Sequence, residues 1–165
     1  MFKSGKSIGK DVTDVQERLS NLEARFGNTA KIGHTGAQTN REGPKKRLLW
    51  VDDFPSNNAF IVEHLQEKGI EVEISLSTDD AINKLKYNMF PAIVTDLGRI
   101  EGGVDNPFAG LDLIKRVREK GNNVPILVFA GQRGFQNEEQ LVSAGAESVT
   151  SSGVDVMAFI EKYVS

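Results

Sequence analysis

The sequence predicts an α/β protein, in which a doubly wound, five-stranded parallel sheet follows an N-terminal helical extension. Two observations support this fold class. Short apolar runs typical of buried strands recur from residue 47 onward, and a segment with helical periodicity follows each of them. Such alternation favours βαβ units with right-handed crossovers and helices on both faces of the sheet.

The five expected strands differ in how they are patterned. Three are continuous apolar runs, as strands buried on both faces usually are. The second alternates apolar and acidic or polar side chains, which indicates one buried face and a place near the edge of the sheet. In chain order the expected strands span 48–51, 70–76, 92–95, 126–129 and 148–150.

The expected helices are bounded by capping signals. Gly69, Gly121 and Gly145 stand where three of the helices would end, because glycine readily adopts the left-handed conformation at a helix C-terminus. Ser77 and Asp80 have the spacing of a capping box at the start of another helix. The expected helices cover 56–68, 77–85, a segment through 111–117, 137–144 and 154–164.

Composition excludes several classes of protein. The net charge of −3 gives no basis for a nucleic-acid partner. The absence of cysteine excludes disulfides, thiolate metal sites and a cysteine nucleophile. No apolar run approaches the roughly 20 residues that span a bilayer, and the N-terminus lacks the apolar core of a signal peptide. We therefore expect a soluble cytoplasmic protein without a membrane partner.

The N-terminal 46 residues are expected to form an extension, and 47–165 the domain itself. Within 11–26, apolar residues alternate in steps of three and four, which predicts an amphipathic helix. About two heptads are present, fewer than a secure coiled coil needs. A lone helix that docks or frays is favoured, and a homodimer through this helix is the alternative. The Gly-rich stretch at 27–47 is predicted to be a flexible linker.

Three carboxylates stand at the ends of two expected strands. Asp52 and Asp53 follow the first strand, and Asp96 follows the third. The carboxyl ends of parallel strands meet at one edge of the sheet, so the three side chains are expected to share one hollow. Neighbouring carboxylates repel unless a cation lies between them, and oxygen ligands suit Mg²⁺. The alternative is that the acidic pair caps the following helix.

From residue 46 onward the chain resembles the receiver domain of two-component response regulators, a CheY-like, flavodoxin-like fold with strand order 2-1-3-4-5. LLWVDDFPSNN is similar to the first strand and its acidic pair, and AIVTDLG to the third strand with its phosphoacceptor. AGLDLIKRVR, VPILVFAG and GAESVTSS are similar to a helix start, to strand four and to the approach to strand five. Their order and spacing together carry the resemblance.

The resemblance implies a role for each acidic residue. Asp96 would be the phosphoacceptor and a metal ligand, and Asp52 and Asp53 would hold Mg²⁺ directly or through water. Gly98, two residues beyond Asp96, would offer its backbone carbonyl to the metal. The expected function is a signalling domain of a two-component phosphorelay, not an enzyme. Its partner would be a sensor histidine kinase or another protein, and its output would pass through protein–protein contacts.

Three positions depart from the family pattern. Ala130 stands where receivers carry a Thr or Ser, Ser152 where they carry a Lys, and Val149 where an aromatic switch residue is common. A hydrogen bond to a charged group contributes roughly 1.5–3 kcal/mol. Loss of two such partners is expected to weaken retention of the phosphoryl group. The alternative function is therefore a degenerate pseudo-receiver that binds proteins independently of phosphorylation.

Other residues offer replacements for the missing groups. Arg99 and Arg133 carry planar guanidinium groups suited to phosphate, although we favour the interpretation that each is a solvated loop cation. Ser152 has the spacing of a capping box with Asp155, and we favour that role over a phosphate contact.

The loop at 97–109 is about six residues longer than the resemblance leads one to expect. Glu101 and Asp105 add negative charge to it. A lid or partner surface over the acidic residues, and a tolerated surface insertion, are equally supported alternatives.

Overall fold

The computed structural model of the chain describes residues 46–164. The expected helix at 11–26, the linker and the dimer contact lie outside the described residues. The described residues contain a five-stranded sheet with the order β2-β1-β3-β6-β7, and every neighbouring pair is parallel. Two further strands form a separate hairpin. When these two are left out of the numbering, the strand order of the sheet is 2-1-3-4-5, as expected, so the predicted fold class is confirmed.

The strands and helices follow the expected alternation. The sheet strands are β1 (Lys46–Val51), β2 (Ile70–Ser75), β3 (Ile93–Thr95), β6 (Ile126–Phe129) and β7 (Ser148–Thr150). The helices are η2 (Pro55–Asn58), α2 (Ala59–Glu67), α3 (Thr78–Tyr87), α4 (Ala109–Glu119), α5 (Gln132–Gln136), α6 (Glu138–Ala144) and α7 (Gly153–Val164).

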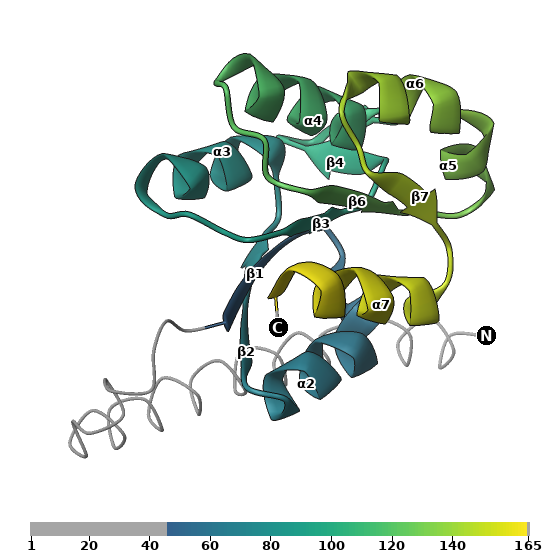
Figure 1. Cartoon of the computed structure of the whole chain (residues 1–165). Coiled ribbons are helices and arrows are strands. Elements are labelled where there is room, and N and C mark those ends of the chain that lie inside the picture. The colour runs from purple at the N-terminus through teal and green to yellow at the C-terminus, as the bar shows by residue number, and fades with distance from the viewer. Residues whose placement is uncertain (1–45, 165) are drawn as a thin grey trace, which may run out of the picture. The chain divides into compact units, whose positions relative to one another are not determined.

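Helices cover both faces of the sheet (Figure 1). Helices α3, α4, α5 and α6 lie on one face and α7 on the other, where the side chain of Ile61 in α2 approaches Gly153 at the start of α7. The main compact unit comprises Lys46–Phe54 and the chain from Ile61 onward, whereas Pro55–Phe60 lies outside it. None of the helices within 46–164 has both the length and the apolar character needed to cross a bilayer.

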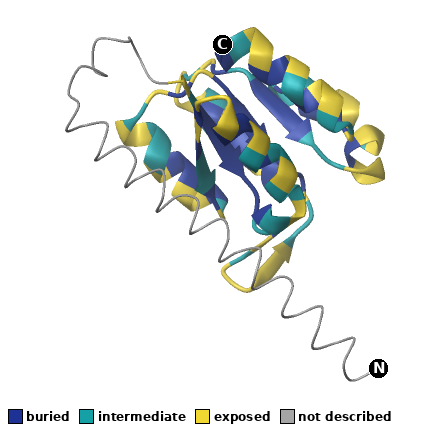
Figure 2. Cartoon of the chain, turned by 90° about the horizontal axis from the view of Figure 1, so that it is seen from below, coloured by how far each residue is buried: buried dark blue, intermediate teal, exposed yellow. Residues whose placement is uncertain are grey.

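The central strands form the core (Figure 2). Successive side chains of β1 point to opposite faces, and all four from Leu48 to Val51 are buried. Leu49 and Val51 belong to the apolar cluster on the side of α3 and α4, with Ile114 of α4 as another member. Trp50 packs edge-on against Phe129 with ring centroids 6.2 Å apart. This buried central strand ends directly at the acidic pair.

Most of the predicted helix ends are confirmed. The Ser77 hydroxyl accepts the Asp80 backbone N–H at 3.1 Å and caps α3. Gly69, Gly121 and Gly145 follow α2, α4 and α6 with φ of 86°, 78° and 126°, a conformation that costs glycine little.

The structure differs from the expectation in the long loop and after β6. Residues of the loop form an antiparallel hairpin of β4 (Arg99–Glu101) and β5 (Val104–Asn106), turned at Gly102 and Gly103. Each strand is too short to show a period in the sequence. Helix α5 begins at Gln132 rather than at 137, so Arg133 lies on a helix and not in the expected loop.

Candidate functional site

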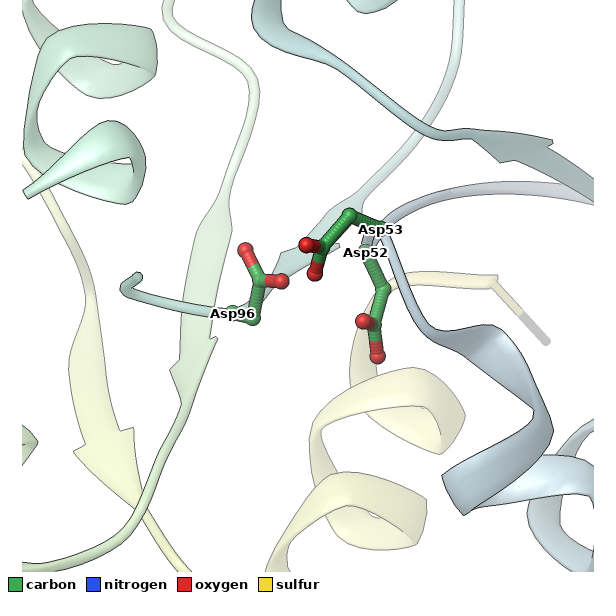
Figure 3. Close-up of side chains that lie close together, drawn as sticks. All are labelled: Asp52, Asp53 and Asp96. Atoms are coloured by element: carbon green, nitrogen blue, oxygen red, sulfur yellow. The ribbon is translucent and has the colours of Figure 1, made fainter. Parts of the chain in front are cut away.

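The three predicted carboxylates meet at the carboxyl ends of β1 and β3. Val51 pairs with Thr95 in the parallel register, so the residues that follow them, Asp52 and Asp96, lie beside one another. One ligand oxygen from each of Asp52, Asp53 and Asp96 lies within 4.8 Å of the other two. Figure 3 shows Asp53 and Asp96 turned toward one another across this space. The expectation that the three side chains come together is confirmed.

Backbone hydrogen bonds fix the acidic pair in place. The Asp52 backbone N–H donates to the Ser75 carbonyl at 2.9 Å, which extends the sheet ladder past β1. The Asp52 Oδ1 accepts the Phe54 N–H at 2.8 Å, the kind of local turn contact that the alternative interpretation expects. The Asp53 Oδ2 accepts the Ile100 N–H at 2.9 Å. A carboxylate has two oxygens and several lone pairs, so these contacts leave capacity for a cation.

Asp96 lies in a setting that disfavours its charge. Its side chain is 17% exposed. Burial raises the pKa of Asp96 to about 8, against the lowering effect of the Arg99 guanidinium, and the neighbouring Asp52 carboxylate adds to the rise. A divalent cation among the three carboxylates would supply the missing positive charge. Hard oxygen donors from three side chains fit Mg²⁺.

The interpretation of Arg99 as a solvated loop cation was wrong. Arg99 lies on β4 with only 1% of its surface exposed. Its Nη1 forms an ion pair with Asp96 Oδ1 and donates to Thr95 Oγ1 at 2.9 Å. Its Nη2 donates to Thr78 Oγ1 at 2.6 Å. The guanidinium is therefore an internal counter-ion for the carboxylate of Asp96.

Glu101 is a second carboxylate that forms an ion pair with Arg99. The Arg99 Nε lies 3.2 Å from Glu101 Oε2. Glu101 also accepts the backbone N–H of Thr78 and, at 3.2 Å, its hydroxyl. Although burial alone would raise the pKa of Glu101, the hydrogen bonds from Thr78 and the charge of Arg99 hold it below its usual value. These contacts tie β4 to the first residue of α3.

Ser152, which stands where the resemblance places a lysine, makes structural hydrogen bonds. The Ser152 hydroxyl accepts the Val154 N–H at 3.2 Å and so caps α7. The favoured role of Ser152 is confirmed, but the box is not reciprocal, because Asp155 accepts the Thr150 hydroxyl at 2.7 Å instead. The Ser152 N–H donates to Thr150 Oγ1 at 3.0 Å.

Ala130 and Val149 pack against α5. A Cβ atom added at Gly134 would lie 2.9 Å from the Ala130 Cβ and 2.9 Å from the Val149 Cγ1. Such separations are shorter than van der Waals contact, so α5 approaches the sheet as closely as a glycine allows. The side chains of Ala130 and Val149, packed against Gly134, thus fill the region where the resemblance places a hydroxyl and an aromatic ring.

Two glycines, Gly98 and Gly110, lie close to the acidic residues. Gly98 is exposed, and a Cβ there would lie 3.5 Å from Arg133 Nη1, which places the Arg133 guanidinium beside it. Gly110 in the first turn of α4 donates its N–H to the Leu97 carbonyl at 2.7 Å. A Cβ at Gly110 would lie 2.2 Å from the Asp96 carbonyl oxygen. Only glycine lets α4 begin so close behind Asp96.

A separate hollow of about 290 Å³ opens between α3, α4 and the hairpin. Thr78 and Glu101 line it together with charged residues of α3 and α4. Arg116 crosses it to pair with Asp79 at 2.8 Å. Thr78 and Glu101 therefore join this hollow to the surroundings of Arg99.

The chain is similar to known bacterial regulatory proteins. No protein-family model matches the chain. The chain is similar to the two-component response regulator PhoP of Pseudomonas aeruginosa, with 28% identity over 101 residues, 61% of this chain and 42% of PhoP. It is also similar to the acid tolerance regulatory protein ActR of Rhizobium meliloti, with 29% identity over 104 residues, 63% of this chain and 50% of ActR. The matches thus span half or less of these relatives.

Solved receiver-domain structures share the fold. A response regulator receiver protein from Pseudomonas putida superposes with a TM-score of 0.60 at 20% identity, covering 73% of this chain and 98% of that one. The response regulator TrrA of Thermotoga maritima, in complex with Mg²⁺ and BeF, superposes with a TM-score of 0.58 at 22% identity, covering 71% and 97%. At such identities the likeness establishes the CheY-like fold.

Proposed function

We propose that this domain, a receiver of the response-regulator type by its fold and its relatives, accepts a phosphoryl group on Asp96 as part of a two-component phosphorelay. The observation that carries the proposal is the convergence of Asp52, Asp53 and Asp96, whose ligand oxygens lie within 4.8 Å of one another at the carboxyl ends of β1 and β3. Such a cluster of charge is costly without a cation.

Mg²⁺ is the cation that these residues would hold. Asp52, Asp53 and Asp96 would supply carboxylate oxygens, and Gly98 would supply its backbone carbonyl, as the resemblance implies. When bound, the ion neutralises the carboxylates and the incoming phosphoryl oxygens. The solved structure of TrrA contains Mg²⁺ with BeF, which supports the same ion for this chain.

Asp96 is the proposed nucleophile. One of its carboxylate oxygens forms a bond to phosphorus, while the bond between phosphorus and the donor breaks and its electron pair leaves with the donor. The carboxyl group must be ionised for this step, and its pKa of about 8 means that it holds a proton in most of the molecules at neutral pH when no cation is bound. Arg99 lowers that pKa and so favours the reactive form.

The donor would be a sensor histidine kinase or a small acyl phosphate, and the output would be a contact with another protein. The curated relatives are regulatory proteins of about twice the matched length.

A pseudo-receiver is the second candidate. It is favoured by Ala130, which has no polar side-chain atom, and by Ser152, whose hydroxyl already caps α7. Under this alternative the fold and the cation site are retained, and protein binding is independent of phosphorylation.

Intact-mass measurement separates the two candidates. The protein would be incubated with Mg²⁺ and acetyl phosphate, with Asp96→Asn as the matched control. The phosphorelay proposal expects a gain of one phosphoryl group in the wild type and none in the variant. A folded wild-type protein that gains no mass in the presence of Mg²⁺ would instead support the pseudo-receiver.

A further inference from the structure

Arg99 stands at a junction between the phosphoacceptor and a different part of the surface. One side of its guanidinium contacts Asp96 and Thr95, and the other contacts Thr78 and Glu101. All three guanidine nitrogens have acceptors, and the side chain is fully buried. A change in charge at Asp96 therefore acts directly on a cation whose remaining partners belong to α3 and the hairpin.

On the opposite side of the site, positions 130, 149 and 152 offer no comparable buried link, and Arg133, whose guanidinium lies beside Gly98, is exposed on α5. Ala130 has no group that could follow a phosphoryl oxygen, and Val149 packs against α5 where Gly134 leaves no spare space. The Ser152 hydroxyl is engaged at the start of α7. The resemblance places a hydroxyl, a lysine and a mobile aromatic ring at these positions, so the usual path from the phosphoryl group to the surface is missing here.

We propose that Arg99 couples the phosphorylation state of Asp96 to the β4–β5 hairpin and the first turn of α3, through Glu101 and Thr78. This inference rests on the proposed function of Asp96. It assigns to the hairpin the response that the altered positions 130, 149 and 152 no longer supply.

The direction of the response follows from charge. Phosphorylation converts the Asp96 carboxylate to the uncharged carbonyl of an acyl phosphate, and the negative charge at the site then lies on the oxygens of the transferred phosphoryl group. The Asp96 oxygen that pairs with Arg99 then loses its charge, and the guanidinium is drawn toward the charged phosphoryl oxygens. Its bonds to Glu101 and Thr78 must weaken or rearrange, because the planar fork cannot reach every acceptor in a new position.

The β4–β5 hairpin also contacts the acidic residues directly and carries exposed apolar side chains. The Ile100 N–H donates to Asp53 at 2.9 Å, so β4 touches the site at a second point. The outward side chains of Ile100 and Val104 are 60% and 67% exposed. A shift of β4 would therefore alter an exposed apolar surface.

Nuclear magnetic resonance of the full chain tests the coupling. Amide spectra would be recorded with Mg²⁺ alone and then with beryllofluoride as the phosphoryl mimic. The variants would be Arg99→Lys, which keeps the charge but not the fork, and Arg116→Gln, a control that removes the neighbouring exposed pair with Asp79. The Thr78 amide is the main reporter, because its proton is donated to Glu101.

The proposal expects beryllofluoride to move the resonances of Thr78 and of 99–106 in the wild type and in Arg116→Gln. In Arg99→Lys the shift at Thr78 should fall by at least half, while residues next to Asp96 still respond. As a second variant, Glu101→Gln breaks the link beyond Arg99 and should reduce the Thr78 response in the same way.

Two results would overturn the coupling alone. Either Thr78 and the hairpin stay unchanged in the wild type while the neighbours of Asp96 shift, or both Arg99→Lys and Glu101→Gln respond like the wild type. If no resonance near Asp96 moves in the wild type, phosphoryl binding at Asp96 fails, and the coupling fails with it.

Discussion

Asp96 combines burial, a neighbouring carboxylate and a buried arginine in one place. Burial and Asp52 oppose its ionisation, and Arg99 favours it, with a pKa of about 8 as the result. The protonation state of the Asp96 carboxyl group is therefore sensitive to a bound cation or phosphoryl group. Neither Asp52 nor Arg99 is next to Asp96 in sequence, so this balance belongs to the folded chain.

The stability of the metal-free protein should depend on the protonation of Asp96. The pKa of Asp96 lies at about 8 in the folded state against an ordinary value of 3.8, so the native state binds more protons than the unfolded state between these pH values. Stability should therefore fall as pH rises from 5 to 9, by a few kcal/mol at most, since each pKa unit is worth about 1.4 kcal/mol.

Asp96→Asn should remove most of that slope. Urea unfolding at pH 5, 7 and 9 without Mg²⁺ would show the variant gaining stability over the wild type as pH rises. Asp105→Asn, which changes an exposed carboxylate of the hairpin, is the matched control. Parallel curves for the wild type and Asp96→Asn would contradict the raised pKa.

At the scale of elements, the start of α4 depends on one glycine. A Cβ at Gly110 would lie 2.2 Å from the Asp96 carbonyl oxygen, so Gly110→Ala must push α4 away from β3. We expect a loss of stability of at least about 1–3 kcal/mol, the usual cost of overpacking. Denaturant unfolding measures it. Gly131→Ala is the control, because a Cβ there meets nothing within 4 Å, and an equal loss in both variants would refute the steric argument.

Helix α7 depends on its cap in a similar way. Ser152→Ala removes the hydroxyl that accepts the Val154 N–H and should cost about 0.5–2 kcal/mol of stability. Thermal unfolding of this variant beside Ser151→Ala, a change at an exposed neighbour, separates the cap from a general effect of serine loss. The same variant should keep its phosphoryl group as long as the wild type does. Faster dephosphorylation would show that Ser152 contacts the phosphoryl group.

At the scale of the whole molecule, the proposed cation should stabilise the fold. Three carboxylates converge only when β1 and β3 are paired, so Mg²⁺ should bind the native state and not the unfolded chain. Binding then adds RT ln(1 + [Mg²⁺]/Kd), about 2.7 kcal/mol at a hundredfold excess over Kd.

Calorimetry checks this expectation. The midpoint of thermal unfolding should rise with Mg²⁺ concentration in the wild type. It should rise much less in Asp53→Asn, which loses one ligand charge but retains an oxygen for the Ile100 N–H. A Mg²⁺ response of equal size in both proteins would place the ion elsewhere.

The fold and the acidic cluster were predictable because their signals are local. Buried strands and capped helices leave periods and end residues in the sequence, as at Leu48 to Val51 and at Ser77. Strand ends in a parallel sheet lie at one edge, so Asp52, Asp53 and Asp96 had to be neighbours once the alternation was recognised.

The tertiary structure alone decided the role of Arg99. Strands β4 and β5 have three residues each, too few for a period, and a single arginine in a Gly-rich stretch resembles any loop cation. Its partner Thr78 lies 21 positions earlier in the chain, and only packing brings the two together. The sequence by itself thus determined which carboxylates gather, through the order of strands and their ends. That Arg99 is the buried cation beside Asp96 was decided by the fold, because its burial and its hydrogen bond to Thr78 have no local pattern.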